Sequence, residues 1–409
     1  MVWVEARERL DSEPGDARAE KVALASPRNP AIDALRGWAV LAVILLHLNI
    51  RVRFDGSELG RYLPKPVFSL LFWSGYPAVI VFFVISGFLI MRTTEIRWGA
   101  AHAIDVRTFY RLRFARIAPA LLLFVVAQSL LQLARVDGFF DEKPVASLPT
   151  TLWSVLTFHM NWLEAKVGYL PGAWDVLWSL CVEELFYLGF PLLLLGVRAR
   201  SGLYLVLAAF AIVGPFARVS LTSNEIWKEH SYLSCMGEIA IGCMAALWVR
   251  GRALSRLASR VLLAAGLGAM LFVLYFRRAV HALGLYDLGL DVTLLSCGTA
   301  ALLISLAATP GRSDAGGAPL LAPLRWLGRS SYEIYLSHMF VVLPATVLFK
   351  RLGTPQLIPF LYIAVIVSSA LLGALVARYY SQPLSLLLRP GARSSTTLGQ
   401  RSQSLPYVP

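Results

Sequence analysis

Charged residues are scarce in this sequence. Asp, Glu, Lys and Arg together make up 15% of its 409 residues, whereas hydrophobic residues make up 57%, and the mean hydropathy is +0.62. Soluble domains carry charge on about a quarter of their residues, because a polar surface has to cover the core. This composition therefore excludes a soluble globular fold.

Cysteine is scarce as well. The four cysteines, Cys181, Cys235, Cys243 and Cys297, fall in apolar runs without metal-ligand spacing. We therefore expect small buried residues rather than a disulfide framework or a metal site. The first 30 residues lack an apolar signal region, which predicts that no signal peptide is cleaved. No internal repeat is obvious, which disfavours transporters built from duplicated halves.

Long apolar runs are what the sequence has in abundance. They are about 20 residues long, the length that crosses the hydrocarbon core of a bilayer as a helix. They are continuous rather than alternating, which argues against a membrane β-barrel. The predicted fold is an all-α, polytopic transmembrane helix bundle. Its ten predicted spans are residues 31–50, 68–91, 113–134, 174–197, 203–219, 231–249, 260–276, 288–308, 330–349 and 356–377.

The distribution of positive charge predicts the orientation of these spans. Cytoplasmic loops carry an excess of Lys and Arg. The short basic loops 198–202 and 250–260 are therefore assigned to the cytoplasm and the acidic stretch 137–143 to the outside. Both termini are then cytoplasmic, and we interpret the net charge of +13 as topology rather than as a nucleic-acid-binding surface. We divide the chain into a polar N-terminal tail, a transmembrane domain and a polar C-terminal tail: 1–28, 29–380 and 381–409.

Residues 151–162 are apolar and aromatic but too short for an ordinary span. Counting them as a span would reverse every later loop and place the basic loops outside. We interpret this segment as an interfacial or re-entrant piece on the outer side. His159 within it is expected to be an interfacial residue rather than a ligand.

The first predicted span contains two ionisable residues, Arg36 and His47. Eleven residues of helix separate them by only about 20° in rotation and about 16 Å along the axis, so they share one face. In one interpretation the arginine snorkels to one membrane interface and the histidine lies at the other. In the second, both face a functional site inside the bundle, where ionisable groups are costly.

The start of the third span is rich in arginine. Arg113 and Arg116 are three residues apart and project from one helix face, and Arg111 lies just before them. They are either a basic flank that sets topology or a phosphate clamp, since guanidinium groups bind phosphate in bidentate fashion. Arg116 lies one turn inside the apolar run, which favours the clamp.

The fourth span contains two adjacent carboxylates. Glu183 shares a helix face with Ser179 and Tyr187, four residues away on either side, whereas Glu184 is flanked at those offsets by leucines. We therefore favour Glu183 as a functional acid. A structural polar anchor between helices is the alternative.

Two further polar groups lie on other spans. Ser331, Tyr335 and His338 fall on one face of the ninth span at spacings of four and three. They either form part of a site or are interior polar residues whose hydrogen bonds are satisfied within the bundle. Ser86 and Gly87 in the second span predict close helix packing.

The ordered set of these motifs resembles the membrane-bound acyltransferase-3 family over nearly the whole chain. Cys181 and Leu185 depart from the family pattern, where Ser and Gln are usual, and Leu112 replaces a frequent Arg. The chain resembles the stand-alone members, without a fused C-terminal hydrolase-like domain. The matching motifs, in chain order, are Arg36 with His47, Ser86-Gly87-Phe88, Arg113 and Arg116 with Ile117 and Pro119, Trp178 to Tyr187, and Ser331-Tyr332 with Tyr335, Leu336 and His338.

The resemblance implies an integral O-acyltransferase of the cytoplasmic (inner) membrane. It would transfer an acyl group, expected to be acetyl, from acyl-coenzyme A to a hydroxyl of a carbohydrate, a lipid-linked sugar or another small acceptor. Acyl-coenzyme A is the expected co-substrate, with no tightly bound cofactor and no metal. A multi-pass transporter or flippase is the main alternative, since intramembrane Arg, His and Glu suit transport equally well. A non-catalytic membrane scaffold is another.

The resemblance and the residue chemistry together suggest roles. We expect His47 to act as general base on the acceptor hydroxyl, or to take the acyl group itself. Glu183 would orient the imidazole, and Arg36 would hold the donor or polarise its thioester oxygen. Arg111, Arg113 and Arg116 would hold the coenzyme A phosphates, and the remaining substrate-binding candidates are Ser179, Tyr187, Tyr335 and His338.

Overall fold

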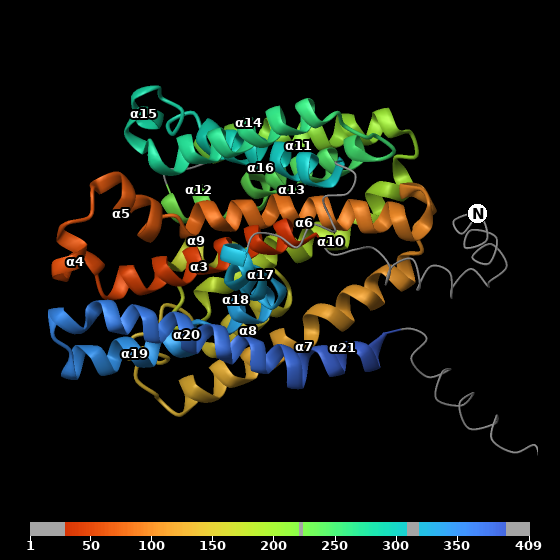
Figure 1. Ribbon diagram of the computed structural model, residues 1–409. Helices are drawn as coiled ribbons and strands as arrows, with labels where there is room; N and C mark the ends of the chain where they lie inside the picture. The colour runs from red at the N-terminus through yellow and green to blue at the C-terminus, as the bar shows by residue number, and fades with distance from the viewer. Residues whose placement is uncertain (1–28, 221–223, 309–318, 390–409) are drawn as a thin grey trace, which may run out of the picture.

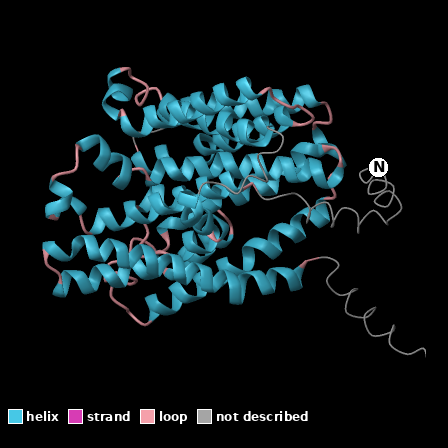
Figure 2. Cartoon of the chain, in the orientation of Figure 1, coloured by secondary structure: helices cyan, strands magenta, loops and turns pink. Residues whose placement is uncertain are grey.

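The computed structural model describes residues 29–220, 224–308 and 319–389. These residues form helices joined by turns and loops, with no strand among them (Figure 2). The all-α fold predicted from the sequence is confirmed. The N-terminal tail, 1–28, and most of the C-terminal tail, 390–409, lie outside the described residues.

Among the described residues, ten helical stretches are long and apolar enough to cross a membrane, as the sequence predicts. The fourth, sixth, ninth and tenth are each built from two or more consecutive helices. In chain order they are α3 (Pro30–Arg51), α6 (Gly75–Trp98), α7 (Val106–Leu133), η3 with α10 (Asp175–Leu177, Trp178–Gly196), α11 (Arg200–Ser220), α12 with α13 (Glu225–His230, Tyr232–Val249), α14 (Arg256–Tyr275), α16 (Leu290–Ala308), α18 with α19 (Ser331–Ser337, Met339–Leu352), and η5, α20, η6 and α21 (Pro355–Leu357, Ile358–Val376, Ala377–Ser381, Gln382–Leu388).

Shorter helices connect these stretches. They are η1 (Phe54–Gly56), α4 (Glu58–Arg61), α5 (Lys65–Phe72), η2 (Ala101–Ala103), α8 (Leu148–Leu156), α9 (Met160–Val167), α15 (Arg277–Ala282), η4 (Pro319–Leu321) and α17 (Ala322–Arg329).

Several predicted span boundaries are wrong, among them the starts of the second and third spans. The second span begins at Gly75 rather than at residue 68, because the chain turns at Trp73 after the separate helix α5. Arg277 Nη2 donates to the Trp73 carbonyl at 2.9 Å and so satisfies the backbone at this turn. The third span begins at Val106 rather than at residue 113, because Asp105 caps the helix and accepts from the Arg107 amide at 3.1 Å.

The segment 151–162 does not form a span. It is divided between α8 and α9, and the two helices meet at Phe158, whose φ is +58°. Neither helix, with nine and eight residues, reaches the length of about 20 residues that a membrane crossing needs. The ring of His159 bonds the Thr157 hydroxyl at 2.6 Å.

The spans form layers around α3 and α6 (Figure 1). On one side α13 and α16 pack against α6, and α11 and α14 lie outside them; on the other side are α7, α19, α20 and α21. Helix α3 begins and α21 ends at the same end of the bundle, which we call the first end (right in Figure 1). Helix α3 finishes at the opposite, second end, beside α4 and α5.

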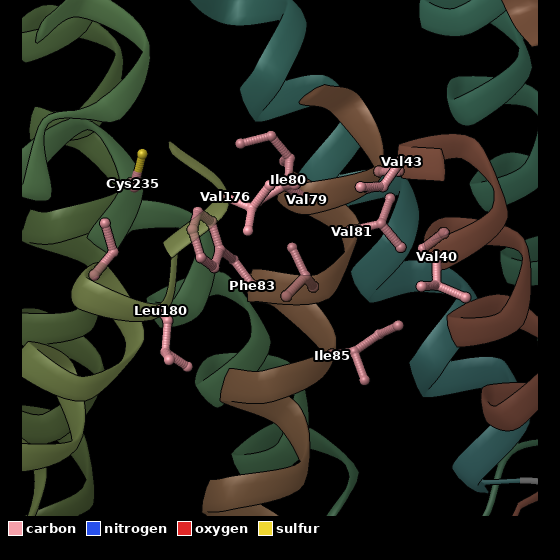
Figure 3. Packing of buried hydrophobic residues seen from close by; sticks show 14 of the residues in the cluster. Val40, Val43, Val79, Ile80, Val81, Phe83, Ile85, Val176, Leu180 and Cys235 are labelled. Atoms are coloured by element: carbon pink, nitrogen blue, oxygen red, sulfur yellow. The ribbon is translucent and has the colours of Figure 1, made fainter. Parts of the chain in front are cut away.

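The core centres on α6, whose buried side chains meet neighbours from α3, α10 and α13 (Figure 3). Gly87 and Gly242 allow α6 and α13 to approach backbone to backbone. A Cβ on Gly87 would lie 1.9 Å from the Ile239 carbonyl oxygen, and one on Gly242 2.0 Å from that of Val84. The close packing predicted for Ser86-Gly87 is therefore confirmed.

The cysteines follow the prediction in part. Cys181, Cys235 and Cys243 are buried and all four cysteines are free, but Cys297 is exposed. Its apolar run could not reveal this, because a lipid-facing position is as apolar as a buried one.

Candidate active site

His47 and His338 meet between α3 and the junction of α18 and α19. The first lies one turn before the end of α3, and the second is the single residue between the other two helices. Nε2 of His338 lies 3.2 Å from Nδ1 of His47, and the ring centroids are 5.0 Å apart. The His338 side chain is fully buried, whereas His47 keeps partial exposure. This pair joins two residues that the sequence placed on separate spans.

Tyr335 ties the histidine pair to the start of α10. Its hydroxyl donates to the Val176 carbonyl at 2.8 Å and lies 2.8 Å from the Ser179 hydroxyl. Its own carbonyl oxygen lies 2.6 Å from Nδ1 of His338. The polar stripes predicted on the fourth and ninth spans therefore meet here. Ser331, the third member of the ninth-span stripe, is buried with no hydrogen-bond partner for its hydroxyl in the described structure.

A second polar cluster joins α6, α10 and α7. The Tyr187 hydroxyl bonds the Ser86 hydroxyl and donates to Oε2 of Glu183 at 3.2 Å. The guanidinium of Arg113 stands 4.3 Å from the centre of the Tyr187 ring, a cation–π geometry. The sequence assigned Ser86 only a packing role, and a hydroxyl beside a required glycine is a weak signal for anything more.

Arginines surround this second cluster. Arg113 and Arg116 both interact electrostatically with Glu183 and Glu184, and Arg36 of α3 interacts with Arg116 and Glu183. Arg116 is exposed although it lies inside a long apolar helix. A charged side chain at this depth requires access to water or to a polar ligand. The structure thus brings the two arginine motifs of the sequence together.

The structure places two candidate residues differently from the sequence interpretation. The carboxylate of Glu183 bonds Tyr187, and no hydrogen bond joins it to His47 among the described residues. Arg111 lies about 200° around α7 from Arg113. It lines a separate open groove of about 390 Å³ with Tyr110, Phe114 and Leu388. Helical periodicity separates Arg111 from Arg113 and places Tyr187 beside Glu183. It cannot show whether Glu183 contacts His47, because these two residues lie on different helices.

Sequence reasoning missed Arg51. Its Nη1 donates to the His47 carbonyl at 2.9 Å, and its charge interacts with Asp175 at the start of the fourth span. The available signal was its position, four residues after His47 on the same helix face.

Comparison with known proteins identifies the family of this chain. Residues 29–379 match the family described as an acyltransferase domain, acyltransferase-3. The chain belongs to this family. The resemblance predicted from the motifs is therefore confirmed.

Three relatives show how far the similarity extends. The putative peptidoglycan O-acetyltransferase YrhL of Bacillus subtilis is 29% identical over 348 residues, covering 80% of this chain and 50% of the relative. The peptidoglycan O-acetyltransferase OatA of Listeria monocytogenes is 27% identical, covering 76% of this chain and 49% of the relative. The O-acetyltransferase OatA of Staphylococcus aureus is 24% identical, covering 88% and 58%.

The chain spans about half the length of the curated relatives it matches. Residues 29–379, which match the acyltransferase-3 family, contain most of the helix bundle described above. No solved structure matches the chain.

Proposed function

We propose that this chain is a multi-pass membrane O-acyltransferase that moves an acetyl group from acetyl-coenzyme A to a hydroxyl of a carbohydrate. The family supports acyl transfer, and the relatives named above support acetyl as the group and a glycan as the acceptor. The observation that carries the proposal is that one face of α3 connects the arginine and glutamate cluster to His47. Arg36 lies beside the arginine and glutamate cluster, and His47 lies about 16 Å further along the same face of the same helix.

The donor would enter through the arginine cluster near the first end of the bundle. Arg113 and Arg116 would hold the coenzyme A phosphates, because paired guanidinium groups suit phosphate oxygens. Glu183 and Tyr187 would keep Arg113 in place in the absence of the donor, through the contacts described above. The pantetheine arm would then follow the face of α3 that carries Arg36 toward His47.

The chemical step would take place at His47. The imidazole would accept the proton of the acceptor hydroxyl while the hydroxyl oxygen attacks the thioester carbonyl. The carbon–oxygen bond forms, the carbon–sulfur bond breaks, and the proton passes from His47 to the departing thiolate to give coenzyme A. Arg36, about 16 Å from His47 along the same helix, would hold part of the donor on its way to this carbonyl. This route needs no oxidant, reductant or metal.

The test is acetyl transfer by membranes that contain the protein. Membranes are incubated with labelled acetyl-coenzyme A and a panel of soluble glycan fragments, and both free thiol and labelled product are measured. We expect thiol release that depends on the acceptor and falls by about 10²-fold or more in His47→Ala, the contribution typical of a positioned base. Transport of the glycan without thiol release would indicate a transporter instead. Unchanged thiol release in His47→Ala would contradict the assigned base.

A further inference from the structure

The two nitrogens of a neutral imidazole have different roles, since one donates a hydrogen bond and the other accepts. A histidine can act as a base only through the nitrogen that carries no hydrogen. Which nitrogen of His47 is free therefore decides from which side an acceptor hydroxyl has to approach. The contacts of His338 answer this question.

The protonation of His338 follows from its backbone contact. Its Nδ1 lies 2.6 Å from the carbonyl oxygen of Tyr335. A carbonyl oxygen only accepts, so Nδ1 carries the hydrogen and donates. In the neutral ring Nε2 then has a lone pair and needs a donor. The ring is fully buried, and that donor can come only from the group it faces.

The group that Nε2 of His338 faces is Nδ1 of His47, at 3.2 Å. The same Nδ1 lies 2.9 Å from the carbonyl oxygen of Val43. Both neighbours are acceptors, so the hydrogen of the neutral His47 ring is on Nδ1. Its Nε2 then carries the lone pair, and the structure shows no hydrogen bond to this nitrogen from any described residue.

We propose that His338 is a positioning residue that holds His47 in the tautomer whose Nε2 is free to act as base. The proposal rests on the proposed function, because it refines the role of His47 in acyl transfer. Tyr335 anchors the arrangement through Val176 and Ser179. When His47 takes the proton of the acceptor hydroxyl on Nε2, its Nδ1–H continues to donate to His338. The proton leaves again from Nε2 to the thiolate, and His338 keeps its own hydrogen throughout.

Two amide substitutions separate this role from a structural one. His338→Asn retains a donor for the Tyr335 carbonyl but is too short to reach His47. His338→Gln places an amide oxygen close to the former Nε2, where it can accept from His47. We expect kcat to fall by about 10–100-fold in His338→Asn, a share of the roughly 10²–10⁴ that a positioned base contributes. We expect His338→Gln to recover most of this loss. The KM for acetyl-coenzyme A should stay within about twofold in both variants, because His338 acts on His47 and does not hold the donor.

The matched control is His159→Asn, at a histidine whose ring bonds the neighbouring Thr157 hydroxyl, and it should leave kcat unchanged. Equal activity of His338→Asn and His338→Gln, or a loss that appears in KM alone, would overturn the proposal. If the wild type itself transfers no acetyl group, the proposed function fails instead.

The tautomer of His47 can also be determined without an activity assay. In the protein labelled with ¹⁵N-histidine and reconstituted in lipid, the resonances of His47 are those that disappear in His47→Asn. We expect the wild type to show Nδ1 protonated and Nε2 unprotonated. We expect His338→Asn to show a smaller share of this tautomer, because the Val43 carbonyl is then the one remaining acceptor for Nδ1 among the contacts described above. A wild-type ring protonated on Nε2 would overturn the inference even if the enzyme is active.

Discussion

At the scale of single residues, His47 has its partner on another helix, because Nε2 of His338 lies 3.2 Å from its Nδ1. Helical spacing correctly placed Ser179, Glu183 and Tyr187 together, and Arg36 with His47. The expected mechanism gave Glu183 the role of orienting His47, but the structure shows Glu183 bonded to Tyr187 and His338 beside His47. Contacts between helices depend on how the helices pack, and one sequence does not encode that visibly.

The two faces of α7 give a prediction at this scale. Arg113→Ala should raise the KM for acetyl-coenzyme A by about 10–100-fold with a smaller effect on kcat, because a hydrogen bond to a charged group contributes about 1.5–3 kcal/mol. Arg111→Ala is the matched control, since Arg111 lines the separate groove with Phe114 and Leu388. Steady-state kinetics of the two variants in membranes provide the comparison. An equal rise in KM for both would place the donor elsewhere.

At the scale of helices, α6 and α13 depend on glycine for their close approach. Gly87→Ala would bring its Cβ into the Ile239 carbonyl oxygen, and the two helices would have to separate. We expect a loss of about 1–3 kcal/mol in stability, as overpacking of a close interface typically costs, and a lower Tm in detergent. Gly268→Ala is the control, because nothing lies within 4 Å of its added methyl group. A Tm for Gly87→Ala equal to that of the control would contradict this packing.

The short helix α9 contributes a pH dependence. Burial and the neighbouring Asp175 carboxyl raise the pKa of Glu164 well above its usual value. The folded protein therefore binds the proton more tightly than the unfolded chain does. The stability that the protonated Glu164 carboxyl contributes is fully present below the ordinary pKa of about 4.5. It is lost as the pH rises through the pKa of Glu164 in the folded protein.

Thermal unfolding in detergent measures this contribution. We expect the Tm to fall as the pH rises from acidic toward neutral, and Glu164→Gln, which mimics the protonated carboxyl, to flatten that dependence. Glu142→Gln, at an exposed glutamate, should leave the slope unchanged. A slope in Glu164→Gln as steep as in the wild type would assign the dependence to other groups.

At the scale of the whole molecule, hydropathy was sufficient to find the ten stretches, within the described part of the chain, that are long and apolar enough to cross a membrane. It was insufficient at their ends, because a sliding apolar window does not detect a cap such as Asp105 or a turn such as that at Trp73. Helix α21 also continues to Leu388, beyond the predicted end of the last span. Lengths and composition determine how many helices form, whereas local hydrogen bonds determine where each one begins and ends.

The orientation of the bundle stays a prediction from the basic loops. Labelling with a membrane-impermeant thiol reagent tests it in intact cells, in a variant that lacks the native cysteines. A cysteine introduced at Ala253, in a basic loop, should be protected until the cells are opened. One introduced at Glu142, in the acidic stretch, should react at once. The reverse labelling pattern would show that the bundle has the opposite orientation in the membrane.

The most direct test of the central claim uses the purified protein in sealed lipid vesicles. The orientation of the protein in these vesicles is determined by the thiol labelling described above. Labelled acetyl-coenzyme A is supplied on one side at a time, with a soluble glycan acceptor on both sides, and labelled glycan is counted. We predict transfer only when the donor is on the side of the basic loops, and a loss of about 10²-fold or more in His47→Ala. Equal transfer by His47→Ala, or transfer only when the donor is on the opposite side, would contradict the account.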